Sequence, residues 1–349
     1  MPSYRWRNVD CFEYWVEPIR LPGECAVIMV ASIGFLRWSL DEFTASRTAL
    51  ATALMRAVHT RLDPNPLIDD PWGDRLVPAS VREMIRTAAL SRMDPAARDK
   101  AMAAPDSIVD ASLRRSPAYA NVITRTRYAE DALQAAVGGG VRQYVLVGAG
   151  FDSFILRRPA YAADLEVFEI DHPATQGLKI QRIRELGIAL PESVHFVASD
   201  LSIESVAAAL SRSSFRRDLG SFFSWLGVSM YLTRAANMAT LRSIARCALP
   251  GSELVLTYID ERLLVSQSEN FTALQERLAS LGEPFLSGFD PKDFAATLRE
   301  CGLNLSEDLS GEEIARRYGR IDSMNSGHSS FSHIARAQVL ERGDRDAEP

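Results

Sequence analysis

Two hydrophobic patterns divide this chain into two parts. In the first part, apolar residues recur at intervals of three and four, which is the spacing of an amphipathic helix. The clearest example is residues 44–62, where Leu50, Leu54 and Val58 share one face. Helix formers continue to dominate, with breaks at prolines, up to a last helix that ends before three consecutive glycines. We therefore expect residues 44–137 to form a helical cap over a later sheet.

In the second part, short apolar segments alternate with segments of helical periodicity. The strand-like segments are 144–147, 165–170, 194–198, 222–231 and 253–258. The helical segments between them are roughly 174–187, 202–211 and 233–247. A helix at 291–299 and a strand at 332–340 follow. Such alternation predicts an α/β fold with a mostly parallel sheet and helices on both faces. We assign residues 138–341 to this core.

Composition restricts the class of protein. The chain has 349 residues, of which 47% are hydrophobic, enough to bury a sizeable core. Its net charge of -6, without a long basic run, gives no reason to expect a nucleic-acid partner. The cysteines are few and scattered and the histidines show no ligand spacing, so we expect no disulfide framework and no metal site. A reducing cytoplasm fits this composition best.

The ends of the chain fall outside these patterns. Residues 25–36 form an apolar run that is too short for a membrane-spanning helix and is preceded by acidic residues. We expect no membrane partner. Met29 is a plausible initiator, since the patterned sequence begins only near Thr44, and mass spectrometry of the native product would test this. Residues 1–43 are therefore treated as an N-terminal extension and residues 342–349 as a polar tail.

The candidate chemistry begins at residues 144–153, which read YVLVGAGFDS. A buried strand runs into two closely spaced glycines, Gly148 and Gly150, before the chain turns toward a helical stretch. Glycines let a backbone approach a nucleotide-type ligand at the carboxyl end of a parallel strand. The same pattern also occurs in ordinary strand-to-helix turns, so the flanking sequence has to decide.

Acidic residues end the next two predicted strands. Asp171 lies about twenty residues beyond the glycines, where a carboxylate is expected to accept hydrogen bonds from ribose hydroxyls. Glu169 is on the same face, but Asp171 is nearer the ligand crevice. Asp200 and Leu201 end the third strand and offer a carboxylate and an aliphatic side chain to an adenine. Each aspartate could instead cap the helix that follows it. Together the two acids favour an adenosine site.

These segments resemble the leucine carboxyl methyltransferase family, and more closely its bacterial branch of S-adenosylmethionine-dependent enzymes. The motifs that carry the resemblance are Arg-Thr-Arg-Tyr at 125–128, Val-Gly-Ala-Gly-Phe-Asp-Ser at 147–153, Phe-Glu-Ile-Asp-His-Pro at 168–173, Ala-Ser-Asp-Leu at 198–201 and Gly-Val-Ser-Met-Tyr-Leu-Thr at 227–233. Ser46 to Ala49 and Pro66 to Pro71 resemble its N-terminal signature. The likeness extends from about residue 44 to about residue 340. It implies a class I, Rossmann-like methyltransferase with a seven-stranded sheet.

The resemblance also implies roles for individual residues. S-adenosyl-L-methionine is the implied cofactor, with an arginine pairing with its carboxylate. Arg125 is the first choice for that arginine and Arg127 the second. The implied cofactor-binding residues are Arg125, Gly148, Gly150, Asp152, Asp171, Asp200 and Leu201. One position departs from the pattern, because the eukaryotic enzymes have a glutamate where Leu226 stands here. That cofactor contact is either absent or made by another group.

The sequence indicates the residues that would contact the acceptor less clearly than those that would bind the cofactor. A carboxylate acceptor is already anionic and needs no base, whereas a hydroxyl usually does. The polar candidates near the crevice are His172, Tyr231 and Tyr258, each with an ordinary structural alternative. Tyr231, at the end of the predicted fourth strand, is the candidate retained, and no residue is assigned as a catalytic base.

The expected function is S-adenosylmethionine-dependent O-methylation of a carboxylate or hydroxyl on a small-molecule acceptor. One alternative is an NAD(P)-dependent oxidoreductase, which shares the glycine turn and the strand-end acid. Ser153 speaks against it, because it stands where a third glycine or alanine would be. The other alternative is a binding module that retains the cofactor site without chemistry, which the absence of a clear base leaves open.

Overall fold

The computed structural model describes residues 45–103, 105–266, 269–280, 282–319 and 331–341. Contacts divide the chain between Phe43 and Thr44, and the description below concerns the unit that begins at Thr44. The apolar run at 25–36 and the tail at 342–349 lie outside the described residues.

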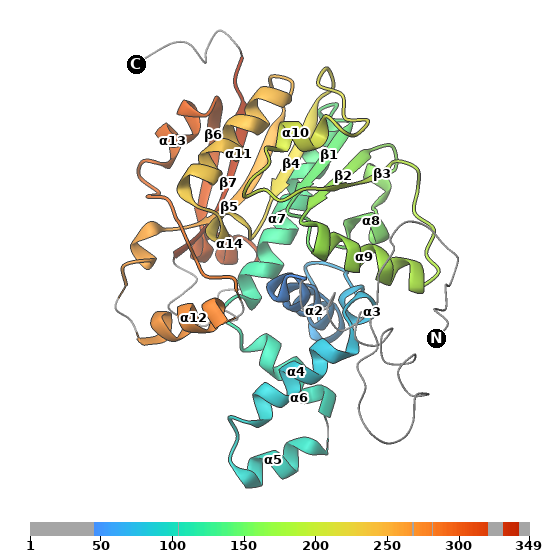
Figure 1. Cartoon of the computed structure of the whole chain (residues 1–349), viewed down its shortest axis with the longest axis vertical. Helices are drawn as coiled ribbons and strands as arrows, with labels where there is room; N and C mark the ends of the chain where they lie inside the picture. The colour runs from blue at the N-terminus through green and yellow to red at the C-terminus, as the bar shows by residue number, and fades with distance from the viewer. Residues whose placement is uncertain (1–44, 104, 267–268, 281, 320–330, 342–349) are drawn as a thin grey trace, which may run out of the picture. The chain divides into compact units, whose positions relative to one another are not determined.

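The core is a seven-stranded sheet with the strand order β3-β2-β1-β4-β5-β7-β6 (Figure 1). Strands β1 to β5 are parallel, and β7 runs antiparallel to both β5 and β6. The strand bounds are β1 Gln143–Val147, β2 Glu166–Asp171, β3 Val194–Ala198, β4 Ser221–Trp225, β5 Glu253–Ile259, β6 Leu303–Ser310 and β7 Ser332–Val339. The predicted fold class is confirmed.

Helices cover both faces of the sheet because successive residues of each strand point to opposite sides. On β1, Tyr144 and Leu146 pack in one hydrophobic core with α2, α7, α8, α9 and α14. Val145 and Val147 pack in a second core with α10, α11 and α13. The bounds of the core helices are α8 Phe154–Arg157, α9 Pro173–Glu185, α10 Val206–Leu210, α11 Arg234–Cys247, α12 Glu269–Ser280, α13 Phe294–Glu300 and α14 Gly311–Arg317.

The segment before the sheet is helical, as predicted. Its helices are α2 Arg47–Leu62, α3 Gly73–Leu76, α4 Ala79–Leu90, α5 Pro95–Met102, α6 Pro105–Arg114 and α7 Tyr119–Gly138. The side chain of Ser46 accepts a hydrogen bond from the Ala49 amide and so caps α2. Helix α2 packs against α3, α6 and α7, whereas α4, α5 and α6 lie farther from the sheet (Figure 1).

Two strand predictions were wrong. The fourth strand ends at Trp225 instead of Tyr231, because Gly227 adopts a φ of 71° that extended strands do not use. Tyr231 instead ends the 3₁₀ turn η2, Ser229–Tyr231. Strand β6 was not predicted, although its leucines alternate with polar residues. It is an edge strand, and Leu303 is its only fully buried residue.

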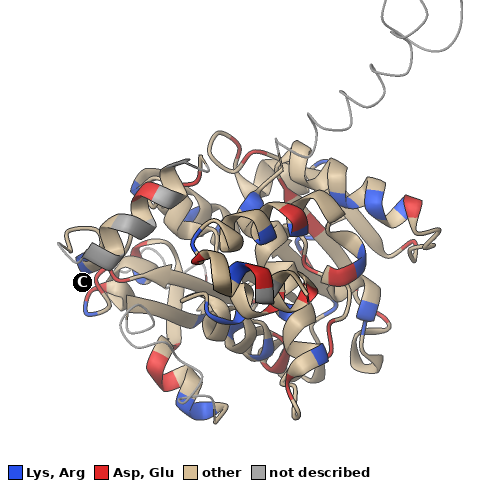
Figure 2. Cartoon of the chain, turned by 90° about the horizontal axis from the view of Figure 1, so that it is seen from below, with Lys and Arg blue, Asp and Glu red and all other residues tan. Residues whose placement is uncertain are grey.

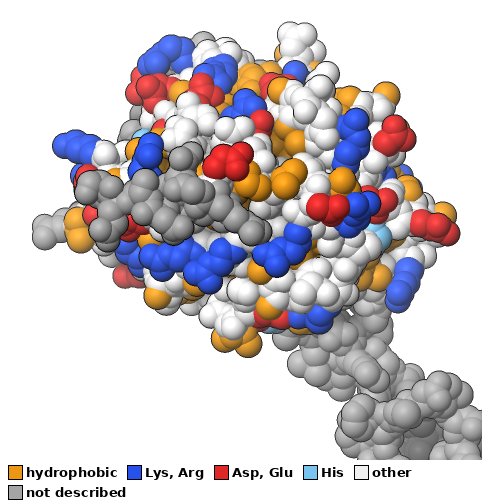
Figure 3. Space-filling model, turned by 90° about the horizontal axis from the view of Figure 1, so that it is seen from above, with side chains coloured by type: hydrophobic (Ala, Val, Ile, Leu, Met, Phe, Trp, Pro, Cys, Tyr) orange, Lys and Arg blue, Asp and Glu red, His pale blue; other side chains and the backbone are white. Residues whose placement is uncertain are grey.

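Charged side chains of both signs are interspersed on the two ends of the molecule that the pictures show. Figure 2 views the chain from the side of α2 to α6, and Figure 3 views the opposite end. In both views, basic and acidic residues lie beside each other. Within the described residues, no helix combines the length and the apolarity that crossing a membrane requires.

Candidate functional site

A cavity of about 440 Å³ lies where the carboxyl ends of β1 to β4 face α2. This volume falls within the range of about 300–1,000 Å³ that is usual for small-ligand sites. The residues that line it include all seven predicted cofactor-binding residues, namely Arg125, Gly148, Gly150, Asp152, Asp171, Asp200 and Leu201. Tertiary structure therefore brings together positions that span 77 residues of sequence, from 125 to 201.

The glycine turn after β1 is tightly enclosed. Gly148 has a φ of 71°, and a Cβ atom there would lie 2.4 Å from Cγ2 of Val228. Gly150 has a φ of 53°, and its Cβ would lie 3.0 Å from Cβ of Ala49 on α2. Both positions therefore require glycine, for backbone conformation and for space. The turn is a cradle that a side chain would fill, which fits the close approach of a ligand to its backbone.

Asp171 lies at the end of β2 and lines the cavity. One carboxylate oxygen accepts a hydrogen bond from the Gly150 amide, and the other accepts from the His172 amide at 2.6 Å. Burial raises the pKa of Asp171, while these two hydrogen bonds act in the opposite direction. The cap of α9 is His172, whose Nδ1 accepts from the Ala174 amide at 3.3 Å. The helix-capping alternative for Asp171 was wrong.

Glu169, which shares a face of β2 with Asp171, has a different role. Its carboxylate is buried against Lys179, whose Nζ lies 2.6 and 2.7 Å from the two oxygens. Burial raises the pKa of Glu169, and Lys179 opposes this. Neither Glu169 nor Lys179 lines the cavity. Of the two acids, Asp171 is the one available to a ligand.

Asp200 and Leu201 form the wall of the cavity beyond β3. Oδ1 of Asp200 accepts hydrogen bonds from the amide of Ser202 at 2.9 Å and from its hydroxyl at 2.6 Å, and these hydrogen bonds lower the pKa of Asp200. The geometry is an Asx turn. The following helix, α10, is capped by Ser205 instead, so the capping alternative was wrong here too.

Arg125 extends from α7 into the cavity. Its Nη1 lies 3.3 Å from Oδ1 of Asn121, and among the described residues its guanidinium forms no ion pair with a carboxylate. Burial lowers the pKa of Arg125 to about 10, with Tyr231 and Asp152 acting to raise it. It stays charged at neutral pH. A charged, unpaired guanidinium in a cavity is suited to a ligand carboxylate.

Arg127, the second choice, is not in the cavity. Two residues along a helix differ by about 200° in direction, so Arg127 faces away. Its Nε pairs with Asp131 at 2.9 Å, and its Nη1 donates to the carbonyl of Leu67 at 3.0 Å. Arg127 as a cofactor ligand was wrong.

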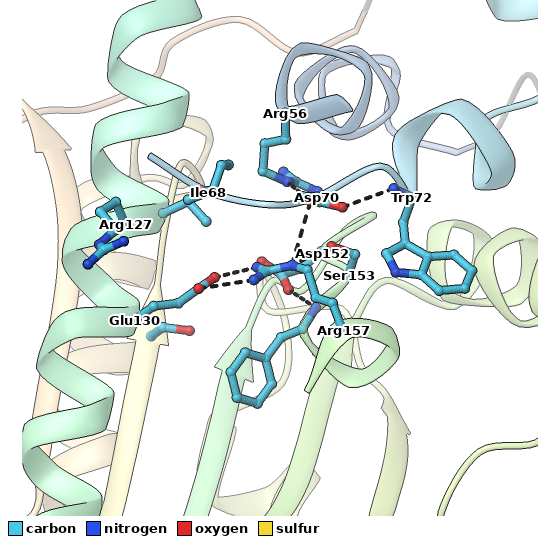
Figure 4. Close-up of polar contacts among 12 residues, drawn as sticks. Arg56, Ile68, Asp70, Trp72, Arg127, Glu130, Asp152, Ser153 and Arg157 are labelled. Carbon is cyan, nitrogen blue, oxygen red and sulfur yellow. Dashed lines mark hydrogen bonds and ion pairs between the residues drawn. The ribbon is translucent and has the colours of Figure 1, made fainter. Parts of the chain in front are cut away.

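A buried ionic network supports the glycine turn from the side of the cap (Figure 4). Nε of Arg56, on α2, lies 2.7 Å from Oδ2 of the fully buried Asp70. Nη2 of Arg56 donates to the carbonyl of Phe151, in the glycine turn, at 2.7 Å. Burial opposes ionisation of Asp70, but Arg56 and Arg157 hold the pKa of Asp70 below its ordinary value. One arginine thus joins the cap to the turn.

Arg157, from α8, completes this network. Figure 4 shows it between Asp70 and Glu130. Its Nε lies 3.8 Å from Oδ2 of Asp70 and donates to Oγ of Ser153 at 2.9 Å, and its guanidinium pairs with Glu130. Asp152 beside it accepts from the Phe154 amide at 2.7 Å. The network was missed from sequence, although Asp70 lies in the proline-punctuated segment that resembles the family signature.

Another polar group lies at the cap side of the cavity. It contains Thr48 at the start of α2, Tyr231 from η2 and Glu283 from the segment after α12, and all three line the cavity. Burial raises the pKa of Tyr231, while a hydrogen bond with Thr48 acts to lower it. Oε2 of Glu283 accepts from the hydroxyl of Thr48 and, at 3.2 Å, from its amide. No sequence pattern indicated Glu283.

Comparison with known proteins shows which family this arrangement belongs to. The family model described as leucine carboxyl methyltransferase matches residues 49–245. The chain belongs to this family. A relative named "Putative S-adenosyl-L-methionine-dependent methyltransferase YktD", from Bacillus subtilis, is 31% identical over 279 residues, which cover 77% of this chain and 90% of the relative. A relative from Mycolicibacterium smegmatis with the same description is 32% identical and covers 65% of this chain and 71% of its own length.

Solved structures agree on the fold. A DUF574 family protein from Streptomyces avermitilis has a TM-score of 0.50 at 13% identity and covers 73% of this chain and 95% of its own. A structure titled as a putative methyltransferase from Thermobifida fusca has a TM-score of 0.50 at 14% identity, covering 74% and 94%. Family membership confirms the predicted activity, S-adenosylmethionine-dependent methyl transfer, and favours it over the nicotinamide-dependent and non-catalytic alternatives.

Of the other residues that the sequence singled out in this methyltransferase, some line the cavity and one does not. Tyr258 was wrong as a crevice residue: its hydroxyl donates to Asp308 and its ring stacks on His333, outside the cavity. His172 lines the cavity in addition to capping α9, and Leu226, the position that departs from the family pattern, lines it as well. Among the described residues, no group of three or more His, Cys, Asp or Glu could hold a metal ion.

Proposed function

We propose that this methyltransferase methylates an oxygen, the carboxylate or hydroxyl of a small-molecule acceptor. The observation that carries the proposal is the guanidinium of Arg125, which pairs with no carboxylate among the described residues and lines one cavity with the glycine turn, Asp171 and Asp200. This set matches the charged and polar groups of S-adenosylmethionine. The hydroxyl of Tyr231 and the carboxylate of Glu283, which contacts Thr48 at the start of α2, then remain for an acceptor.

Each residue has a defined task in this proposal. Arg125 pairs with the cofactor carboxylate, Asp171 accepts hydrogen bonds from the ribose hydroxyls, and Asp200 and Leu201 contact the adenine. When bound, S-adenosylmethionine supplies an electrophilic methyl group on a positively charged sulfur. The protein aligns the acceptor oxygen with that group and excludes water from the cavity.

Calorimetric titration tests the cofactor side. We expect binding of S-adenosylmethionine and S-adenosylhomocysteine, and no binding of NAD. Arg125→Met should weaken both by about 10- to 100-fold, since a charge-assisted pair contributes about 1.5–3 kcal/mol. The matched control is Arg127→Met, on the same helix but outside the cavity, which should change either affinity less than about twofold. Equal losses in the two variants would contradict the assignment of Arg125.

Incubation with labelled cofactor tests the chemistry. An extract of the source cell should yield a labelled small molecule when it is supplied with the enzyme and methyl-labelled S-adenosylmethionine. Label that appears only in protein, or tight cofactor binding with persistent absence of transfer, would contradict the proposed acceptor class.

A further inference from the structure

We propose that Glu283 is the general base of the reaction and that the acceptor is a neutral hydroxyl compound, an alcohol or a phenol, not a carboxylate. This inference rests on the proposed function and concerns the acceptor end of the same cavity. It starts from the contacts of one carboxylate that no motif identified.

Glu283 is held in place from the cap. Its Oε2 accepts from both the amide and the hydroxyl of Thr48, in the first turn of α2. A helix N-terminus presents free backbone N–H groups, and the amide and hydroxyl of Thr48 together fix the orientation of the carboxylate. Its other oxygen, Oε1, has no hydrogen-bond donor among the described residues. Glu283 lines the cavity, and Oε1 is therefore the oxygen available to an acceptor.

Glu283 is placed to contact the acceptor and is not one of the proposed cofactor contacts. The proposed adenosine contacts are at the ends of β2 and β3, and the proposed carboxylate contact is Arg125. Tyr231 lines the same cavity as these two charged residues and hydrogen-bonds with Thr48, and both charges act on its hydroxyl. Polar groups therefore extend along the cavity from Arg125, the proposed contact of the cofactor carboxylate, to Glu283.

Charge selects the class of acceptor. A carboxylate acceptor would lie against the carboxylate of Glu283, and two like charges in a cavity repel each other. A neutral hydroxyl is not repelled by Glu283. It can donate a hydrogen bond to Oε1, which leaves an oxygen lone pair free to face the methyl group. Hydroxyl methylation usually requires such a base, and carboxylate methylation does not.

The acceptor hydroxyl loses its proton to Oε1 of Glu283, and its oxygen forms a bond to the methyl carbon. The bond between that carbon and sulfur breaks, its electron pair remains on the sulfur, and the positive charge there is lost. Glu283 releases the proton to water after the product leaves.

The kind of product provides the first test. Methyl-labelled products made in the source-cell extract are treated with mild base and, separately, with hot hydriodic acid. We expect label that is stable to base and is released by the acid as methyl iodide, which identifies a methyl ether. Release of labelled methanol by base would identify an ester and overturn the inference while leaving the proposed function intact. Label resistant to both treatments would lie on nitrogen or carbon and would contradict both this inference and the proposed function, and no product at all would contradict the proposed function.

Glu283→Gln provides the second test. Its amide oxygen can still accept from Thr48, so we expect S-adenosylhomocysteine affinity by calorimetry and the melting temperature to match the unmodified enzyme, with affinity changed less than about twofold. Removal of the base should lower kcat on the ether-forming acceptor by about 100-fold. The matched control, Glu276→Gln on the exposed surface of α12, should retain full activity. Unchanged kcat, or parallel losses of kcat, affinity and stability, would overturn the assignment of Glu283 as a base.

Discussion

At the scale of the residue, Gly227 determines where Arg125 can lie. Gly227 has a φ of 71°, and a Cβ atom there would lie 2.5 Å from Nη2 of Arg125. Since the clash is with the end of a flexible side chain, the guanidinium would move while the backbone fold persisted. Gly227 therefore affects ligand binding indirectly, because it leaves room for the guanidinium of Arg125.

Gly227→Ala should therefore weaken S-adenosylhomocysteine binding by at least about tenfold, as measured by calorimetry. Its matched control is Gly251→Ala, where φ is 83° and no atom lies within 4 Å of the added Cβ. Both variants should lose about 1–2 kcal/mol of stability, because alanine disfavours left-handed backbone. Only Gly227→Ala should lose affinity. Weak binding in both variants would mean that backbone strain, not displacement of Arg125, is the cause.

The sequence predicted which residues line the cavity where a motif fixed their position relative to a strand end. Asp171, Asp200 and the glycines follow strands, and parallel strands bring their carboxyl ends to one edge. For arginine the sequence left two choices, since the direction of a helix residue depends on how the helix is rotated against the sheet. That rotation is set by packing, which placed Arg125 in the cavity and Arg127 outside it.

At the scale of the element, Arg56 joins α2 to the glycine turn. Its contacts with Asp70 and with the carbonyl of Phe151 are both 2.7 Å long. Removal of this arginine would leave Asp70 buried, with Arg157 3.8 Å away as the remaining cation of the network. An incompletely paired buried charge is strongly destabilising, unlike an exposed one.

Arg56→Met should lower the free energy of unfolding at pH 7 by about 3–5 kcal/mol in urea titrations. Because the folded pKa of Asp70 is lowered, the stabilisation from its ionised form is present at neutral pH and is lost as the pH falls below its ordinary value of 3.8. The exposed i, i+4 pair of Arg316 and Glu312 supplies the control, and Arg316→Met should cost about 0.5 kcal/mol or less. Similar costs for both variants would contradict a supporting role for the buried network.

At the scale of the whole molecule, the cap and the core share one cavity. The lining includes Thr48, Ala49 and Arg56 from α2 together with the strand ends of the core. We propose on this basis that the two helices of this segment that line the cavity, α2 and α7, close over the bound cofactor. Ligand binding should then stabilise both parts together, because a ligand that contacts both lowers the free energy only of the assembled state.

Hydrogen exchange with and without saturating S-adenosylhomocysteine tests this proposal. Amides of the glycine turn should gain protection, and so should amides of α2, which the ligand would approach from the strand ends. Helix α5, which does not line the cavity, serves as the internal control and should exchange at the same rate in both states. Protection confined to the strand ends would contradict closure by the cap.

The sequence by itself determined the class of fold, the helical segment before the sheet, the glycine turn and the acids that follow β2 and β3. These features are local, because each depends on the periodicity of a short segment or on residues next to a strand end. Tertiary structure alone decided which arginine enters the cavity, how Arg56 and Asp70 support the turn, and that Glu283 meets Thr48 across 235 positions of sequence. Such contacts depend on packing between distant elements, and no short segment of sequence contains that information.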